Sequence, residues 1–156
     1  MGMSYMLTFF MDLRPSNTLL EGRMILTKNG ELIDIYRATS GSVGNQDRDD
    51  TDSKGRGAIP ATMEVGLKNY WVETKAIPMP NKKGIEGNFY AIKPFTVSVG
   101  GVQRGDFGVH ADANVPGSAG CIVLPPDGNG WKVFQERMRD ISKEGVGRVP
   151  LQVVYW

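Results

Sequence analysis

Short apolar segments, each bounded by turn-forming residues, recur along most of the chain. This pattern is typical of β-strands joined by short connections. Twenty glycines and nine prolines are distributed between the segments, as expected for frequent turns. We therefore expect a mainly β protein. The segments predicted to be strands are residues 4–12, 23–27, 31–38, 62–67, 70–74, 89–93, 95–99, 107–110, 122–124 and 149–156.

The clearest local signal is the pair Asn29-Gly30, which separates two segments that alternate apolar and polar residues, 23–27 and 31–38. Both turn residues tolerate a positive φ angle, as the two-residue turn of a β-hairpin requires. The sequence therefore predicts a hairpin here.

One segment instead has helical periodicity. Asp127 and Asn129 are candidate N-caps before it, and Gly145 follows its end. An apolar stripe at this spacing is expected to face the core. The stripe consists of Trp131, Phe134, Met138 and Ile141.

Length and charge narrow the class of protein. The 156 residues fit one domain over residues 1–156, with residues 1–20 adding an N-terminal strand. The net charge is +1 with scattered basic residues, so nothing points to nucleic acid or to an anionic membrane. The N-terminus has no basic region before its short apolar stretch, and no apolar run reaches 18 residues. We therefore expect neither a signal peptide nor a membrane span, and synthesis in the cytoplasm.

An acidic segment at residues 47–52 raises the question of calcium binding. An EF-hand loop starting at Asp47 would need glycine at its sixth position and glutamate at its twelfth. Asp52 and Ala58 stand there instead. We interpret the segment as a solvated loop.

The candidate chemistry lies in residues 107–125, which hold the only histidine, His110, and the only cysteine, Cys121. A thiol becomes a strong nucleophile when a nearby imidazole takes its proton. The imidazole needs an orienting group, and the Ala111 carbonyl and Asp112 are the two candidates. The small residues 117–120 allow a tight turn whose N–H groups converge on a developing oxyanion.

Other interpretations of the same residues stay open at this point. A lone cysteine often serves as a small buried hydrophobe, and a lone histidine often makes only structural hydrogen bonds. A metal site is disfavoured because Asp112 is the one obvious ligand beside His110 and Cys121.

The segment Ser118-Ala119-Gly120-Cys121 resembles the Ser-x-Gly-Cys signature of the YkuD-like L,D-transpeptidases, and His110 stands where that family has its upstream histidine. Further elements occur in the family's order over about residues 20–156. They are the Asn-Gly hairpin, a Ser-Gly stretch at 40–41, a loose match to a Thr-Pro-x-Gly-x-Phe element at 57–63, the helix, and a closing strand from about 147.

Three departures from the family pattern stand out. Ala119 occupies a position where most members have histidine, and Val123 occupies one where arginine or asparagine is usual. The interval from His110 to Cys121 is eleven positions, which is short for the family. This short-loop variant is similar to peptidoglycan-targeting effectors delivered by type VI secretion and to phage-encoded members.

The resemblance implies a peptidoglycan L,D-transpeptidase. Cys121 would attack the carbonyl between meso-diaminopimelate and D-alanine of a tetrapeptide stem, releasing D-alanine and forming a thioester. His110 would act as base and then acid, oriented by the Ala111 carbonyl, and the N–H groups of Ala119, Gly120 and Cys121 would form the oxyanion hole. An amine acceptor gives a 3-3 cross-link or D-amino acid exchange; water gives L,D-carboxypeptidase or endopeptidase activity.

The resemblance further implies a YkuD-like β-sandwich with one main helix packed on it, no metal or organic cofactor, and action in the cell envelope or periplasm after delivery. It does not predict an oligomeric state. Ser118, Asp112 and Arg104 are candidate substrate contacts, although Arg104 and the nearby Asp106 fit surface charges equally well. The alternatives are a non-catalytic wall-binding or phage structural protein on the same scaffold, and a cysteine peptidase with another substrate.

Overall fold

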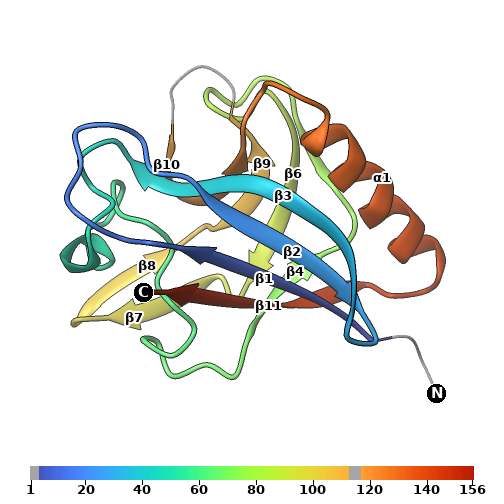
Figure 1. Cartoon of the computed structure of the whole chain (residues 1–156), viewed down its shortest axis with the longest axis horizontal. Helices are drawn as coiled ribbons and strands as arrows, with labels where there is room; N and C mark the ends of the chain where they lie inside the picture. Colours follow the sequence, from blue (N-terminus) through green and yellow to red (C-terminus); the bar gives the residue numbers. More distant parts are fainter. Residues whose placement is uncertain (1–3, 113–116) are drawn as a thin grey trace.

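The computed structural model describes residues 4–112 and 117–156. Within them the chain is mainly β with one α-helix, as expected (Figure 1). A short 3₁₀ helix, η1 (Arg48–Asp50), begins at Asp47, whose side chain accepts a hydrogen bond from the Arg48 N–H. The other elements are β1 (Tyr5–Met11), β2 (Gly22–Lys28), β3 (Glu31–Ser42), β4 (Tyr70–Glu73), β5 (Ile77–Met79), β6 (Gly87–Lys93), β7 (Thr96–Val99), β8 (Val102–Gly105), β9 (Gly108–Ala111), β10 (Gly117–Leu124), α1 (Gly130–Lys143) and β11 (Arg148–Tyr155).

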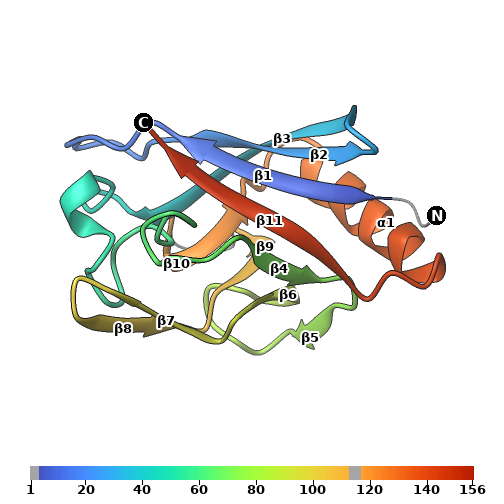
Figure 2. The ribbon, with the colours of Figure 1, turned by 90° about the horizontal axis from the view of Figure 1, so that it is seen from below.

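Among the described residues, eight strands pair in a ring in the order β4-β11-β1-β2-β3-β10-β9-β6. The ring closes where β4 meets the second half of β6, with Trp71 opposite Lys93 and Val72 opposite Ile92. Closure leaves the ring without an unpaired edge. Figure 2 shows β1, β2, β3 and β11 on one side of this barrel and β4, β6, β9 and β10 on the other. β5 pairs with the first half of β6, and β7 and β8 form a separate hairpin.

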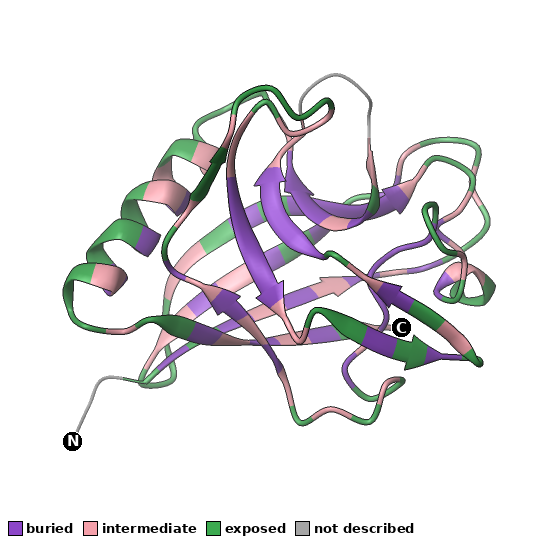
Figure 3. Ribbon diagram, turned by 180° about the vertical axis from the view of Figure 1, so that it is seen from behind, coloured by how far each residue is buried: buried purple, intermediate pink, exposed green. Residues whose placement is uncertain are grey.

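Buried side chains of the strands fill the barrel, at alternate positions in β1, β2 and β11 and as continuous buried runs in β6 and β9. In β1, Leu7, Phe9 and Met11 are fully buried and the residues between them are not, because successive side chains point to opposite faces. Figure 3 shows both patterns, with strands that alternate between purple and the other colours and strands that are purple along most of their length. No helix of the described residues is long and apolar enough to span a membrane.

Helix α1 packs its apolar stripe on the barrel, as predicted. Phe134, Met138 and Ile141 are buried, and Trp131 packs against them at the edge of the core. The Phe134 ring meets Tyr36 of β3 and Tyr90 of β6 edge-on.

The Asn-Gly hairpin prediction is confirmed. Asn29 and Gly30 connect β2 to β3 with φ angles of 52° and 82°, the left-handed region that this turn needs.

The predicted strand at residues 62–67 is wrong: this segment forms consecutive turns. The Ala61 carbonyl accepts hydrogen bonds from the N–H groups of Glu64 and Val65, and the Glu64 carboxylate in turn accepts one from the Ala61 N–H at 3.1 Å. These local hydrogen bonds compete with strand pairing. Two short strands, β5 and β8, were not predicted.

Candidate active site

The pairing of β9 with β10 brings the histidine and the cysteine to one face of the sheet. The two strands are parallel, with His110 opposite Val123 and Val109 opposite Ile122. Since side chains alternate between faces, Val109 and Ile122 point into the core, and His110, Val123 and Cys121 point to the outer face. Strand pairing therefore sets the position of His110, while the position of Cys121 also depends on the irregular segment before Ile122.

A large bulge then lifts the cysteine segment out of the sheet. Between β10 and β3, Gly117 pairs with Ser42 and Ile122 pairs with Ser40, so four residues of β10 face one residue of β3. Such irregularities end regular pairing and redirect side chains, and they are common beside active sites. Gly117 has φ +86°, and a Cβ there would lie 2.5 Å from the Gly41 carbonyl oxygen, so this corner requires glycine.

Side chains of the protein hold the backbone carbonyls of the bulge. Arg104 donates to the Ala119 carbonyl at 3.1 Å, and Ser40 donates to the Gly120 carbonyl at 3.1 Å. The Ser118 hydroxyl donates to the Cys121 carbonyl and also accepts a long hydrogen bond, 3.3 Å, from the Gly120 N–H. The peptide planes on both sides of Cys121 are thereby fixed.

The imidazole of His110 is buried and held in one tautomer. Its Nδ1 lies 2.8 Å from the Ala111 carbonyl oxygen, the orienting group implied by the family resemblance. A carbonyl only accepts hydrogen bonds, so Nδ1 carries the proton and Nε2 keeps a lone pair. Burial lowers the pKa of His110, against the opposing effects of the Ala111 hydrogen bond and the charge of Asp112. His110 is thus a neutral base whose lone pair lies on Nε2.

The other candidate orienter, Asp112, makes no hydrogen bond to the imidazole that the described residues record. Its carboxylate accepts the Gly117 N–H at 3.0 Å instead, which ties together the two ends of the short loop that the sequence singled out. Residues 113–116 of that loop lie outside the described residues.

The thiol of Cys121 is protonated at neutral pH. Its pKa is raised to about 11, mainly by burial. The charge of Asp106 acts in the same direction, whereas a backbone hydrogen bond from Gly108 and the charge of Arg104 act against it. Sγ donates to the Asp106 carbonyl at 3.8 Å. Within 4–112 and 117–156 no hydrogen bond joins Sγ to His110, so the resting pair is neutral, and proton transfer must accompany nucleophilic attack.

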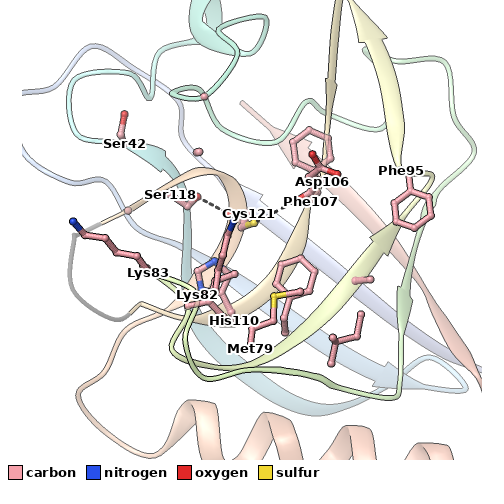
Figure 4. A pocket seen from close by; sticks show the side chains of 18 of the residues that line it. Ser42, Met79, Lys82, Lys83, Phe95, Asp106, Phe107, His110, Ser118 and Cys121 are labelled. Carbon is pink, nitrogen blue, oxygen red and sulfur yellow. Dashed lines mark hydrogen bonds between the residues drawn. The ribbon is translucent and has the colours of Figure 1, made fainter.

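His110 and Cys121 line one cleft with a volume of about 690 Å³ (Figure 4). Phe89 stacks on the His110 ring at a centroid distance of 6.1 Å, and Gly108 leaves the space for it, because a Cβ there would lie 2.1 Å from the Phe89 ring. Aliphatic and aromatic side chains and three lysines form the remaining walls. They include Ile77, Met79, Ile85, Phe95, Phe107, Lys82, Lys83 and Lys93.

A second, smaller cleft of about 270 Å³ also reaches Cys121. It is lined by Cys121, Ala119, Asp106 and Arg104, with the exposed Lys54 at its side. Cys121 therefore borders both clefts.

Arg104 is neither the substrate contact nor the surface charge that the sequence suggested. As a surface charge it would be exposed, but it is only 2% exposed. Its four terminal N–H groups each donate to a backbone carbonyl, those of Thr51, Gly57, Ala58 and Ala119. These donors are not available to a substrate.

Three features of the site were missed at the sequence level: the Ser40 hydroxyl, the Phe89 ring and the lysines at positions 82 and 83. Ser40 stands in the Ser-Gly stretch shared with the family pattern, which was its only signal. Phe89 and the lysines come from the β5–β6 region, distant in sequence from His110, and no periodicity marks them.

Comparison with models of known protein families, with curated proteins and with solved structures gave no match for this chain. Its function is therefore argued from the site itself and from the sequence motif.

Proposed function

We propose that this protein is a cysteine acyltransferase of the L,D-transpeptidase type that acts on the tetrapeptide stems of peptidoglycan. One observation carries the chemistry: His110, whose Nδ1 is held by a carbonyl and whose Nε2 carries the lone pair, shares a cleft with Cys121, whose flanking carbonyls are held by hydrogen bonds. The resemblance of residues 118–121 to the family signature supplies the substrate class.

The reaction begins with transfer of the Cys121 proton to Nε2 of His110 as Sγ attacks the stem carbonyl between meso-diaminopimelate and D-alanine. The N–H groups of Ala119, Gly120 and Cys121 stabilise the oxyanion. The Gly120 N–H is held by a hydrogen bond of 3.3 Å to Ser118, which a charged oxygen would replace favourably. His110 then returns the proton to the leaving D-alanine amine, and a thioester remains on Cys121.

The charges of the larger cleft fit such a substrate. Stem peptides carry several carboxylates. The described lining of the cleft includes Lys82, Lys83 and Lys93 and one acid, Asp106. A cleft with an excess of one charge concentrates ligands of opposite charge.

The fold supports the proposal only through its fold class, mainly β with one helix. A mainly β chain with one packed helix agrees with a YkuD-like domain, and the sandwich arrangement of that family is part of what we propose. A closed ring of eight strands, counted over the described residues, is not specific to that sandwich.

A second function, a non-catalytic wall-binding protein on the same scaffold, is favoured by the resting state of the thiol. The Cys121 thiol donates a hydrogen bond to the Asp106 carbonyl, and the pKa of this thiol is about 11. In addition, Val123, at the position where the family has arginine or asparagine, is fully buried and offers no polar group to a substrate.

Incubation with a disaccharide-tetrapeptide, followed by mass spectrometry, separates the two functions. We expect loss of one D-alanine, or its replacement when another D-amino acid is supplied. Cys121→Ala and His110→Ala should each abolish this reaction, while Met63→Ala, at a 90% exposed position, should retain it.

The identity of the product distinguishes transfer from hydrolysis, because water as acceptor yields only the shortened stem. Binding of the stem without any turnover would favour the non-catalytic function. Full activity of the folded Cys121→Ala protein would exclude the acyl-enzyme mechanism.

A further inference from the structure

Arg104, a buried residue of β8, connects two other segments of the chain. Nη1 donates to the carbonyls of Thr51 at 2.8 Å and Ala58 at 2.5 Å, and Nη2 donates to those of Gly57 at 2.9 Å and Ala119 at 3.1 Å. The planar, rigid guanidinium suits this arrangement, because its donors point in fixed directions. Three of its partners belong to the connection before β4, and the fourth belongs to the bulge that carries the nucleophile.

The guanidinium touches the nucleophile segment closely. A Cβ on Gly120 would lie 2.6 Å from Nη2 of Arg104 and 2.7 Å from the Phe107 ring. Gly120 also has a φ angle of +128°. The glycine before the cysteine is thus required by the arginine behind it, and not only by the approach of a substrate.

In the described part of the chain no salt bridge includes Arg104. The charges of Glu64 and Asp52 act on it from beyond ion-pair distance, and the Phe107 ring lies 5.3 Å from its guanidinium carbon. A buried charge without an ion-pair partner is costly. It also acts strongly on neighbouring groups, because little water screens it. Arg104 and Cys121 line the same small cleft.

We propose that Arg104 is a positioning residue for Cys121: it fixes the peptide between Ala119 and Gly120, and its unpaired positive charge favours the thiolate. Arg104 makes no contact with the substrate in this role. The role of Arg104 in turnover rests on the proposed function. Its effect on thiol reactivity does not, because that reactivity is measurable without any substrate.

The charge component follows from the groups around the thiol. Burial and the Asp106 charge raise the pKa of Cys121, and Arg104 is the charged group that lowers it. Removal of this cation leaves only the backbone hydrogen bond from Gly108 to favour the thiolate against burial and the Asp106 charge. The thiolate, not the thiol, reacts with alkylating reagents.

The first experiment measures alkylation by iodoacetamide at about pH 8, below the thiol pKa, where rate follows thiolate fraction. The chain has one cysteine, so the mass adduct reports Cys121 alone. We expect Arg104→Met to react about tenfold more slowly than the wild type, the effect of a thiol pKa higher by one unit. Arg104→Lys retains the charge and should stay within about threefold of the wild type.

Lys54→Met is the matched control. Lys54 lines the same small cleft but is exposed, so solvent screens its charge. Its removal should change the alkylation rate less than about twofold. If folded Arg104→Met reacts as fast as the wild type, the charge component is overturned.

The second experiment uses Arg104→Lys, which remains informative if Arg104→Met does not fold. A lysine has three N–H donors on a single nitrogen, so it cannot donate to all four carbonyls that the guanidinium holds. Amide hydrogen exchange should accelerate in residues 117–122 and stay unchanged in α1. A uniform acceleration, or none, would overturn the positioning role. If the wild type alkylates as described but never turns over a stem peptide, the proposed function fails and Arg104 keeps its role toward the thiol.

Discussion

His110 is the residue whose protonation state decides what this site can do. Its Nδ1 is held by the Ala111 carbonyl, Phe89 stacks on its ring, and burial keeps it neutral. The sequence allowed two orienting groups for the imidazole; the structure places the carbonyl at Nδ1 and uses Asp112 to hold Gly117. Which of the two groups orients the imidazole depends on the direction of the backbone at the end of β9, and this direction cannot be predicted from residue types.

Because burial lowers the pKa of His110 below its usual 6.5, protonation must destabilise the fold. Between the folded pKa and 6.5 the unfolded chain binds more protons, so the free energy of unfolding rises with pH in this window and falls as the pH drops below 6.5. We expect His110→Gln to lose this part of the pH dependence. Urea unfolding from about pH 5 to pH 7.5 measures it. An identical slope in both proteins would contradict the assignment.

The bulge in β10 is the element that organises the site. Most of the strands around it, and the Asn-Gly hairpin, could be predicted, because alternation and turn residues are local signals. The bulge could not, because it depends on which residues of β3 lie opposite β10. Residues 62–67 were wrongly predicted as a strand because the sequence shows their apolar pattern. It does not show the hydrogen bonds between Ala61 and Glu64 that form turns instead.

Ser40 of β3 links the bulge to the connection before β4, and its removal should lower the stability of the protein. Its hydroxyl accepts the Ile59 N–H at 2.9 Å and donates to the Gly120 carbonyl at 3.1 Å, with all three residues buried. Ser40→Ala leaves both backbone groups unsatisfied and should lower the free energy of unfolding by about 1–3 kcal/mol. Ser98→Ala, at an exposed position, is the control and should change it by less than about 0.5 kcal/mol. Equal effects in urea unfolding would show that the Ser40 link is dispensable.

At the scale of the whole molecule, the class of fold was predictable but its closure was not. The apolar pattern predicts many strands and one helix, and both are present. The pairing of β4 with β6 joins segments that no pattern relates, and it turns a sheet into a barrel. The cleft lies beside this junction, where β5 replaces β4 along β6.

The contact of α1 with the barrel gives a prediction for the molecule as a whole. Phe134 is fully buried between Tyr36 and Tyr90, so Phe134→Ala should lower the free energy of unfolding by about 3–5 kcal/mol. Glu136→Ala, on the exposed side of α1, should change it by less than about 0.5 kcal/mol. Thermal or urea unfolding tests the pair, and a small loss in Phe134→Ala would show that α1 contributes little to the core.

The most direct test of the proposed chemistry is the intact mass of the protein after brief mixing with a disaccharide-tetrapeptide. We predict a covalent adduct equal in mass to the substrate less one D-alanine, located on Cys121 and absent from Cys121→Ala and His110→Ala. An unmodified wild-type protein beside unconsumed substrate, under conditions where the stem is bound, would contradict the acyl-enzyme.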